Sequence, residues 1–333
     1  MYDHYIALEW AKRNMVIARI TGRTGFKAEI YEGRPRIPEV LGYLRRLNGS
    51  KALTFEESTG AQWLYTELKD EVDELIVCDP YRNHLLKEGP KTDRIDARKL
   101  AELLRAGLLK PVYHSGEEFL RLRKLVRGYS GVVRAMVRVK CQHRALMWAS
   151  GKDAESGEIT GKTDRFVMEG LDRMLETCKA EKARYEAEFK HLTSRHRLMR
   201  YLKSVPGIGD IGAVKIVAIV VDAHRFPTVR HFLSYCGLVT LDRISGGKVY
   251  GRKSPRCCRE LKSVFKTAAR CTIREHNDNP MRDYYCHLLN EKNLASYNAA
   301  HGVARYIARV VFGILKSPAK YNPERREACS VSA

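Results

Sequence analysis

Over its first hundred residues the chain alternates short, apolar, β-rich runs with segments of helical periodicity, and this alternation restricts the fold more than any other feature. Period-two patterns rich in β-branched residues predict strands at 5–10, 15–21 and 26–31, with a hairpin turn at 22–25. Helical spacing predicts helices at 38–47, 62–69 and 92–106. Two further apolar runs, at 51–55 and 74–78, lie between these helices and are predicted to be buried strands.

The order of these elements is three strands, then helix, strand, helix, strand and helix. This is the order expected of a ribonuclease-H-like α/β domain, in which hairpin-connected strands come first and strand–helix–strand units follow. We therefore expect residues 1–115 to form a domain of this class.

Two long helices are expected to follow this domain. Apolar residues recur at helical spacing across 117–148 with basic residues between them, and again across 165–198. The Gly- and Ser-containing stretch 150–162 separates them and predicts a turn. We expect residues 116–200 to form an antiparallel helical arm, which is either a plain intramolecular hairpin or a coiled coil that dimerises.

The charge of the chain is unevenly distributed. Sixty Lys and Arg against thirty-nine Asp and Glu give a net charge of +21. Residues 1–100 carry 17 basic and 16 acidic side chains, so nearly all of the excess follows them. Such an excess predicts a polyanionic partner, and nucleic acid is the first choice; the alternative is that it only keeps the protein soluble. Residues 201–318 predict a compact, mainly helical, basic domain, and 319–333 a flexible polar tail.

Several classes of protein are excluded by composition. No apolar run approaches the roughly 18–20 residues that span a bilayer, so we expect no membrane partner. The first ten residues lack the basic-then-apolar layout of a signal peptide, which predicts a cytoplasmic protein. The nine cysteines form no CxxC pair, and their spacing predicts neither a zinc ribbon nor a disulfide framework.

Four carboxylates of the N-terminal domain are candidates for catalysis. Glu9 ends the first strand, Glu57 follows the buried strand 51–55, and Asp93 and Asp96 share one face of a helix start because they are three residues apart. Glu56 competes with Glu57, since strand alternation lets only one of the two face the site, and we prefer the residue directly before Ser58. Each element alone is weak, because an Asp near a helix start is more often a cap than a ligand.

Converging carboxylates repel each other unless a cation neutralises them, and hard oxygen ligands favour Mg²⁺. Two such ions about 4 Å apart can activate a nucleophile and stabilise the leaving oxygen in phosphodiester chemistry. The four carboxylates therefore predict a site for two Mg²⁺ ions.

Two features of the C-terminal part predict contacts with nucleic acid. Gly207 and Gly209 lie in a turn that opens an apolar helix, resembling a helix-hairpin-helix whose N–H groups bind phosphate; the alternative is an ordinary tight turn. Ten basic and two acidic residues occur between Asp242 and Arg274. The basic residues expected to contact phosphates are Lys248, Arg252, Lys253, Arg256, Arg259, Lys262, Lys266 and Arg270. The alternative for them is a solvated helix face. Ser245, beside Gly246 and Gly247, is predicted to lie on a flexible loop.

Six motifs occur in order along the chain: IALEWAK, EESTG, KTDRIDARKLAELL, SVPGIG, FLSYCGLV and ISGG. In combination they resemble the DEDD transposases of the insertion-sequence 110 group, which includes the Piv-type DNA invertases. The resemblance covers residues 4–318, and KTDRIDA is its most specific part.

This resemblance implies a RuvC-like catalytic domain that holds Mg²⁺ through Glu9, Glu57, Asp93 and Asp96, a coiled coil for oligomerisation, and a C-terminal transposase domain. It implies that Ser245 attacks a DNA phosphate and forms a covalent phosphoserine link, with the acidic quartet of another subunit completing a composite site. Strand exchange between donor and target DNA then runs through a Holliday junction. A dimer or tetramer is implied, and some members use a structured guide RNA.

The chain departs from the family pattern at one position, because Glu9 stands where the first motif normally has Asp. The longer side chain moves the carboxylate outward by about one C–C bond, and Mg²⁺ demands near-ideal geometry. Two alternatives to a recombinase therefore remain open. One is a Mg²⁺-dependent nuclease of the Holliday-junction-resolvase kind, in which water attacks the phosphate. The other is a nucleic-acid-binding protein whose metal site has decayed.

Overall fold

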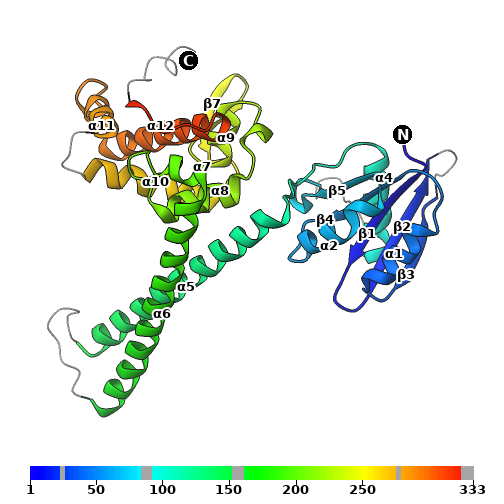
Figure 1. Cartoon of the computed structure of the whole chain (residues 1–333), viewed down its shortest axis with the longest axis horizontal. Helices are drawn as coiled ribbons and strands as arrows, with labels where there is room; N and C mark the ends of the chain where they lie inside the picture. The colour runs from blue at the N-terminus through cyan, green and yellow to red at the C-terminus, as the bar shows by residue number, and fades with distance from the viewer. Residues whose placement is uncertain (23–26, 84–91, 152–160, 275–278, 324–333) are drawn as a thin grey trace. The chain divides into compact units, whose positions relative to one another are not determined.

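The structure of the chain is a computed structural model that describes residues 1–22, 27–83, 92–151, 161–274 and 279–323 (Figure 1). The chain divides into two compact units, Met1–Ser115 and Gly116–Ala333. Among the residues so described, no helix is both long and apolar enough to cross a membrane. The turns predicted at 22–25 and 150–162, and the tail predicted at 319–333, lie largely outside these residues.

The first unit contains a five-stranded mixed sheet. Its strands are β1 (His4–Trp10), β2 (Met15–Thr21), β3 (Glu29–Gly33), β4 (Lys51–Glu56) and β5 (Glu74–Cys78). They lie in the order β3-β2-β1-β4-β5. The β1–β2 and β2–β3 pairs are antiparallel, whereas β1–β4 and β4–β5 are parallel. The predicted α/β character is confirmed, with the third strand at Glu29–Gly33 rather than 26–31.

Helices cover both faces of this sheet, α4 (Asp93–Arg105) on one face and α1 (Ile37–Arg45) and α2 (Ala61–Leu68) on the other. The 3-10 turn η1 (Lys69–Glu71) comes before β5, and the short helix α3 (Pro80–Asn83) comes after it. Successive residues of β1 enter different cores, since side chains alternate along a strand. Tyr5 and Ala7 pack with α4, while Ile6 and Leu8 pack with α1 and α2. This alternation decides below which side chains can reach the start of α4.

Two long helices open the second unit, α5 (Glu117–Ala149) and α6 (Lys162–Arg195), and they lie against each other as an antiparallel hairpin (Figure 1). Aromatic rings hold their contact, with Tyr129 of α5 packed edge-on against Phe189 of α6 at 5.3 Å between centroids. The second helix was predicted over about 165–198, and α6 ends three residues earlier, at Arg195. His196 adopts an extended conformation, and its Nδ1 caps a new helix, α7 (Arg197–Leu202), by accepting from the Met199 N–H.

The remaining helices of the second unit surround one large apolar core. They are α8 (Asp210–Val220), η3 (Ala223–Arg225), α9 (Val229–Tyr235), α10 (Arg259–Arg274), α11 (Pro280–Asn290) and α12 (Ser296–Lys316). Phe232 of α9 stacks on Phe312 of α12 at 4.9 Å and meets Phe265 of α10 edge-on. The mainly helical character predicted for this part is confirmed.

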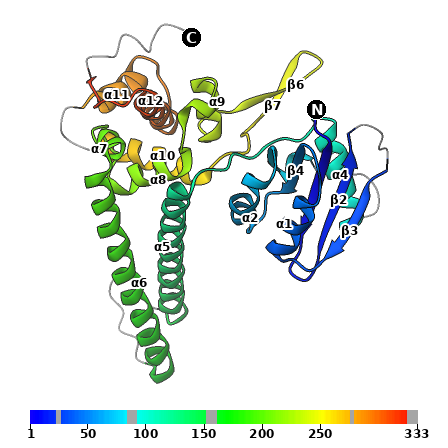
Figure 2. The same cartoon turned by 45° about the vertical axis from the view of Figure 1, so that its right-hand side comes forward.

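The described part of this unit also contains strands. A two-stranded hairpin, β6 (Leu241–Ser245) and β7 (Lys248–Lys253), follows α9 and extends away from the helices of the unit (Figure 2). The prediction of a flexible loop around Ser245 is corrected here, since Ser245 ends a strand. Alternation was hard to detect in the sequence because both faces of the hairpin carry charged and apolar residues.

Candidate active site and nucleic-acid surface

Glu9 lies at the carboxyl end of β1, opposite Val16 of β2. Because it is two residues beyond Ala7, strand alternation places it on the face that α4 covers. The side chain is half-buried. Glu9 therefore lies on the same side of the sheet as α4, the helix that carries Asp93 and Asp96.

The start of α4 is fixed by its cap. Thr92 is extended, and its Oγ1 accepts a hydrogen bond from the Ile95 N–H at 3.3 Å, which satisfies one of the free donors of the first turn. Asp93 is exposed and accepts from Nδ2 of Asn14 at 3.2 Å. Asn14 lies in the tight turn directly after β1, so this bond joins the start of α4 to the end of the strand that carries Glu9.

Asp96 lies one turn into α4 and is only 8% exposed. It is next to Ala97, which packs in the core between α4 and the sheet. Asp93 and Asp96 thus occupy the same end of α4, with Asp93 exposed and Asp96 buried. Their convergence on one site through a shared helix face stays a prediction.

The adjacent glutamates Glu56 and Glu57 are turned to different sides. On β4, Ala52 packs with α4, whereas Leu53 and Phe55 pack with α2. Alternation therefore places Glu56, the last residue of β4, on the side of α4 and Glu9. Glu57 follows the strand and donates its backbone N–H to the Cys78 carbonyl at 2.9 Å.

The side chain of Glu57 is engaged by a histidine that the sequence analysis missed. Nε2 of His114 lies 2.8 Å from Oε2 of Glu57, and Nδ1 lies 2.9 Å from Oε1 of Gln62 in α2. The imidazole also stacks on Tyr65 at 5.0 Å. No sequence signal marks His114, because it is 57 residues from Glu57 and comes close only through the fold.

The donor set fits a hard divalent cation, since its members are carboxylates. In the described part of the chain, however, no three or more His, Cys, Asp or Glu side chains come close enough together to hold a metal ion. The predicted residues thus have the right chemistry and lie at one end of β1, β4 and α4, without forming a closed ligand shell here.

Ser245 is exposed at the tip of the β6–β7 hairpin, where it pairs with Lys248. The two residues between them, Gly246 and Gly247, have φ values of 55° and 76°. Positive φ at both central positions is the type I′ turn that matches the twist of a two-residue hairpin, and glycine adopts it without strain. The ISGG motif therefore presents the serine hydroxyl on a projecting hairpin.

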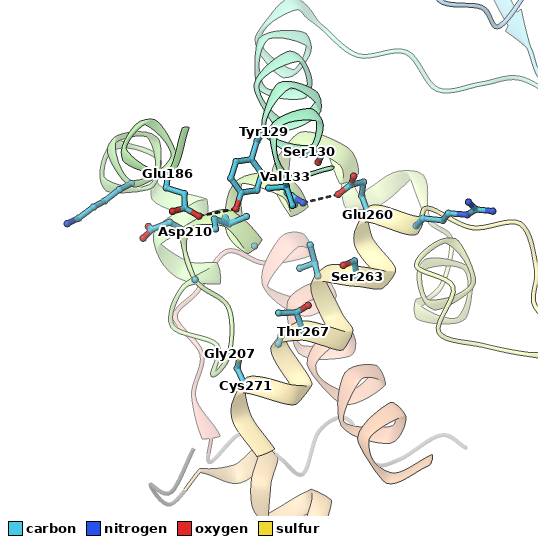
Figure 3. Close-up of a pocket in the computed structure, with 18 of the residues that line it drawn as sticks. Tyr129, Ser130, Val133, Glu186, Gly207, Asp210, Glu260, Ser263, Thr267 and Cys271 are labelled. Carbon is cyan, nitrogen blue, oxygen red and sulfur yellow. Dashed lines mark hydrogen bonds and ion pairs between the residues drawn. The ribbon is translucent and has the colours of Figure 1, made fainter. Parts of the chain in front are cut away.

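Gly207 and Gly209 line a cavity of about 990 Å³ in the second unit, between α5, α6, α8 and α10 (Figure 3). Gly207 has φ 79°, and a Cβ there would lie 2.4 Å from the Ala268 carbonyl of α10. Its role as seen is close packing of the turn on α10. Gly209 caps α8 from an extended conformation and has open space around it.

Polar side chains on the walls of this cavity form hydrogen-bonded pairs. Lys215 donates to Glu260 at 2.9 Å, and Tyr129 donates to Glu186 at 3.0 Å (Figure 3). Burial opposes ionisation of Asp210 at the start of α8, but hydrogen bonds from Lys203 and Thr193 outweigh it and lower the pKa of this carboxyl. A phosphate approaching this turn thus meets an ionised carboxylate as well as the N–H groups of the helix.

The predicted cationic residues of α10 lie on its outer side. Its buried side carries Leu261, Phe265 and Ala268, and Arg259 and Arg270 are exposed. Lys262 and Lys266 are half-buried. Nζ of Lys266 donates to the hydroxyl of Tyr297 at 3.2 Å, and this bond lowers the pKa of the tyrosine.

The predicted basic residues before α10 lie on or just after the hairpin. Lys248, Arg252 and Lys253 belong to β7 and are exposed, and Arg256 is exposed in the connection to α10. Arg252 forms an ion pair with Asp242 of β6 at 3.0 Å. Among the predicted cations of the hairpin, Arg252 therefore has its charge compensated by an opposing strand.

Comparison with known proteins connects both units to one kind of protein. Residues 6–149 match the profile of the DEDD transposases of IS110, and residues 199–286 match that of the IS116/IS110/IS902 transposase family. A protein of insertion element IS110 from Streptomyces coelicolor is 29% identical over 49% of this chain and 39% of its own length.

Two further relatives carry transposase names. One from Sinorhizobium fredii, y4qE, is 26% identical over 73% of this chain and 65% of its own length. One from Pseudomonas aeruginosa, named as a family 20 transposase, is 26% identical over 71% of this chain and 75% of its own length. The chain spans less than two thirds of the Streptomyces and Sinorhizobium relatives that it matches. With both of its units matched by profiles of one group, the chain belongs to the IS116/IS110/IS902 family of DEDD transposases.

Proposed function

We propose that the protein is a metal-dependent DNA transposase or site-specific recombinase. The observation that carries the proposal is the pairing of two features matched by the family profiles. One is the acidic start of α4 beside the end of β1, and the other is the exposed serine at the tip of a basic hairpin. The mixed sheet and the helices on both of its faces are consistent with a ribonuclease-H-like, RuvC-like catalytic unit.

In this proposal Ser245 is the nucleophile. Its Oγ attacks the phosphorus of a DNA phosphodiester and loses its proton, while the bond from phosphorus to the deoxyribose oxygen breaks and that oxygen is protonated. The product is a phosphoserine link between protein and DNA, which conserves the phosphoester for strand exchange. The exposed position of the hydroxyl and the adjacent Lys248 support this role.

Glu9, Asp93, Asp96 and one of the adjacent glutamates, Glu57 or Glu56, would hold the metal. Bound there, Mg²⁺ ions would polarise the phosphate and stabilise the charge that develops on the leaving oxygen. Asn14 orients Asp93 by its hydrogen bond, and Thr92 sets the first turn of α4 that presents both aspartates. These two residues act on the carboxylates and not on DNA.

The proposed partners are donor and target DNA, a structured guide RNA, and further copies of the chain as a dimer or tetramer. The net charge of +21 supports a polyanionic partner, and the exposed cations of the hairpin and of α10 supply phosphate contacts. The coiled-coil arm and its use in oligomerisation remain part of the proposal. Sequencing the nucleic acid that copurifies with the protein tests the RNA: one discrete species transcribed beside the gene is expected.

The test of the nucleophile is a covalent adduct. End-labelled DNA spanning an end of the mobile element is incubated with the protein in Mg²⁺ and run on a denaturing gel. A labelled protein band is expected for the wild type and for Ser254→Ala, an exposed serine just after the hairpin, and no band for Ser245→Ala. Cleavage without an adduct would indicate the nuclease alternative, in which water attacks, and DNA binding without any cleavage would indicate the decayed one.

A further inference from the structure

The two faces of the β6–β7 hairpin differ in chemistry at its tip. Directly opposed residues of an antiparallel pair point to the same side, and neighbours along a strand point to opposite sides. Ser245 and Lys248 are opposed to each other, as are Leu241 and Lys253. With Arg243 between them on β6, this side carries three cations, of which Lys248 is directly opposite the serine.

The other side of the hairpin carries an apolar pair at its tip. Ile244 is opposed to Val249, and their side chains are 64% and 57% exposed. Farther from the tip, the opposed pair on this side is Asp242 and Arg252, which neutralise each other through their ion pair. The register shifts between Arg243 and Ile244, so that Tyr250, 66% exposed, is the extra residue of a β-bulge.

Exposed apolar side chains that gather in one place, with charged residues around them, mark a contact site for a partner. The surrounding charge indicates the chemistry of that partner. The hairpin, residues 241–253, holds four basic residues and one acidic residue. The cores of protein–protein interfaces are depleted of charge, whereas proteins that bend DNA combine phosphate-binding cations with aliphatic residues placed between base steps. Ile244 and Val249 have no group that could hydrogen-bond to a base edge, so their contact with DNA is one of shape and apolar packing.

We propose that the hairpin is a wedge for duplex DNA: the Ile244–Val249 pair inserts against the bases beside the scissile phosphate and unstacks them, while the Ser245 face contacts that phosphate. This inference rests on the proposed function for the identity of the substrate. It adds a distortion step that the attack by serine does not itself require. The unstacked bases would give the strand the freedom to be exchanged.

The test separates unstacking from cleavage by using Ser245→Ala protein, purified with its associated nucleic acid. It is bound to a DNA duplex spanning an end of the mobile element, and permanganate, which oxidises unstacked thymines, is then applied. Reactive thymines beside the cleavage position are expected. They should disappear when Ile244→Ser and Val249→Ser are added, with DNA affinity changed by about threefold or less because the cations are kept. Leu108→Ser, which changes an exposed aliphatic residue just after α4, is the matched control and should change nothing.

A second measurement uses the protein with Ser245 intact. The Ile244→Ser, Val249→Ser variant should cleave paired DNA at least about tenfold more slowly. Its cleavage rate should recover on DNA that is mismatched beside the cleavage position, because the bases there are already unstacked. Thymines that stay reactive in the variant, or a defect of equal size on paired and mismatched DNA, would overturn the wedge. So would a change of oligomeric state in the variant, which would assign the apolar pair to a protein contact. Unstacking without a serine adduct would instead overturn the proposed nucleophile.

Discussion

His114 holds Glu57 against helix α2, with its Nε2 2.8 Å from the carboxylate and its Nδ1 2.9 Å from Oε1 of Gln62. Gln62 in turn donates its amide to the Ser115 carbonyl at 3.2 Å, which fixes the orientation of its oxygen. Both ring nitrogens therefore face oxygen atoms of neighbouring side chains, which fixes the orientation of the imidazole. The side chain of His114 is 4% exposed and that of Glu57 is 40% exposed.

His114→Ala should accordingly lower the free energy of unfolding by about 1–3 kcal/mol, because it removes a buried ring and takes from Oε1 of Gln62 the ring nitrogen that it contacts. Urea denaturation of the full chain measures this. The matched control is His143→Ala, whose histidine makes a longer, more exposed contact of 3.5 Å to Asp172 and should cost no more than about 0.5 kcal/mol. If the free energy of unfolding falls equally in the two variants, the contact of His114 with Glu57 does not stabilise the fold more than an exposed contact does.

The two neighbouring glutamates can be separated by matched substitutions. The EESTG motif predicts Glu57 as the metal ligand, whereas the face of β4 favours Glu56. From the geometry we expect Glu56→Gln to abolish DNA cleavage and Glu57→Gln to reduce the cleavage rate only partly. His114→Ala should reduce the cleavage rate by a similar factor, because it removes the contact that orients Glu57. Initial cleavage rates at saturating Mg²⁺ measure both. The reverse order would establish Glu57 as the ligand, with His114 as the residue that orients it.

Removal of the metal should stop cleavage while leaving DNA binding in place. Chelation by EDTA should abolish strand cleavage, and added Mg²⁺ should restore it. Asp93→Asn should have the same effect permanently, without loss of folding, since Asp93 is exposed. Asp70→Asn, an exposed carboxylate of the same unit, should cleave like the wild type. Cleavage by Asp93→Asn at the wild-type rate would remove this residue from the site.

Much of the first unit could be predicted from the sequence, because its apolar patterns have the period of the structure they form. The strands at β1, β2, β4 and β5 and the helix that begins at Thr92 are examples. The choice between Glu56 and Glu57 could not be made from the motif, since it depends on which face Ala52 and Phe55 occupy once helices cover both sides of the sheet.

Contacts between residues far apart in the chain, and local breaks in a periodic pattern, could not be predicted from the sequence. His114 reaches Glu57, and Tyr297 reaches Lys266 across 31 residues, through folding alone. The break at His196 interrupts a pattern that is periodic on both sides, because one extended residue changes the direction of the chain while leaving the spacing of apolar residues intact. The hairpin at Ser245 was hidden because neither of its faces is buried.

Gly207 offers a test of the turn before α8. Gly207→Ala must place its Cβ against the Ala268 carbonyl and hold φ at 79°, so the free energy of unfolding should fall by about 2–4 kcal/mol. Gly131→Ala, in the middle of α5 with open space at its Cβ, should instead stabilise the chain by about 0.5–1 kcal/mol. Thermal unfolding of both variants gives the comparison, and a tolerated Gly207→Ala would contradict the close packing on α10.

The cations of α10 should act through salt-dependent contacts with phosphate. Arg270 is exposed on the outer side of the helix, and Arg270→Gln should weaken binding to all DNA sequences alike. The slope of log affinity against log salt should fall by about one, because one phosphate contact and its released counterion are lost. Arg46→Gln, which removes an exposed cation at the end of α1 in the nearly neutral first hundred residues, should leave the slope unchanged. Fluorescence anisotropy across a series of salt concentrations measures the slopes, and equal slopes for Arg270→Gln and the wild type would place this side of α10 away from the nucleic acid.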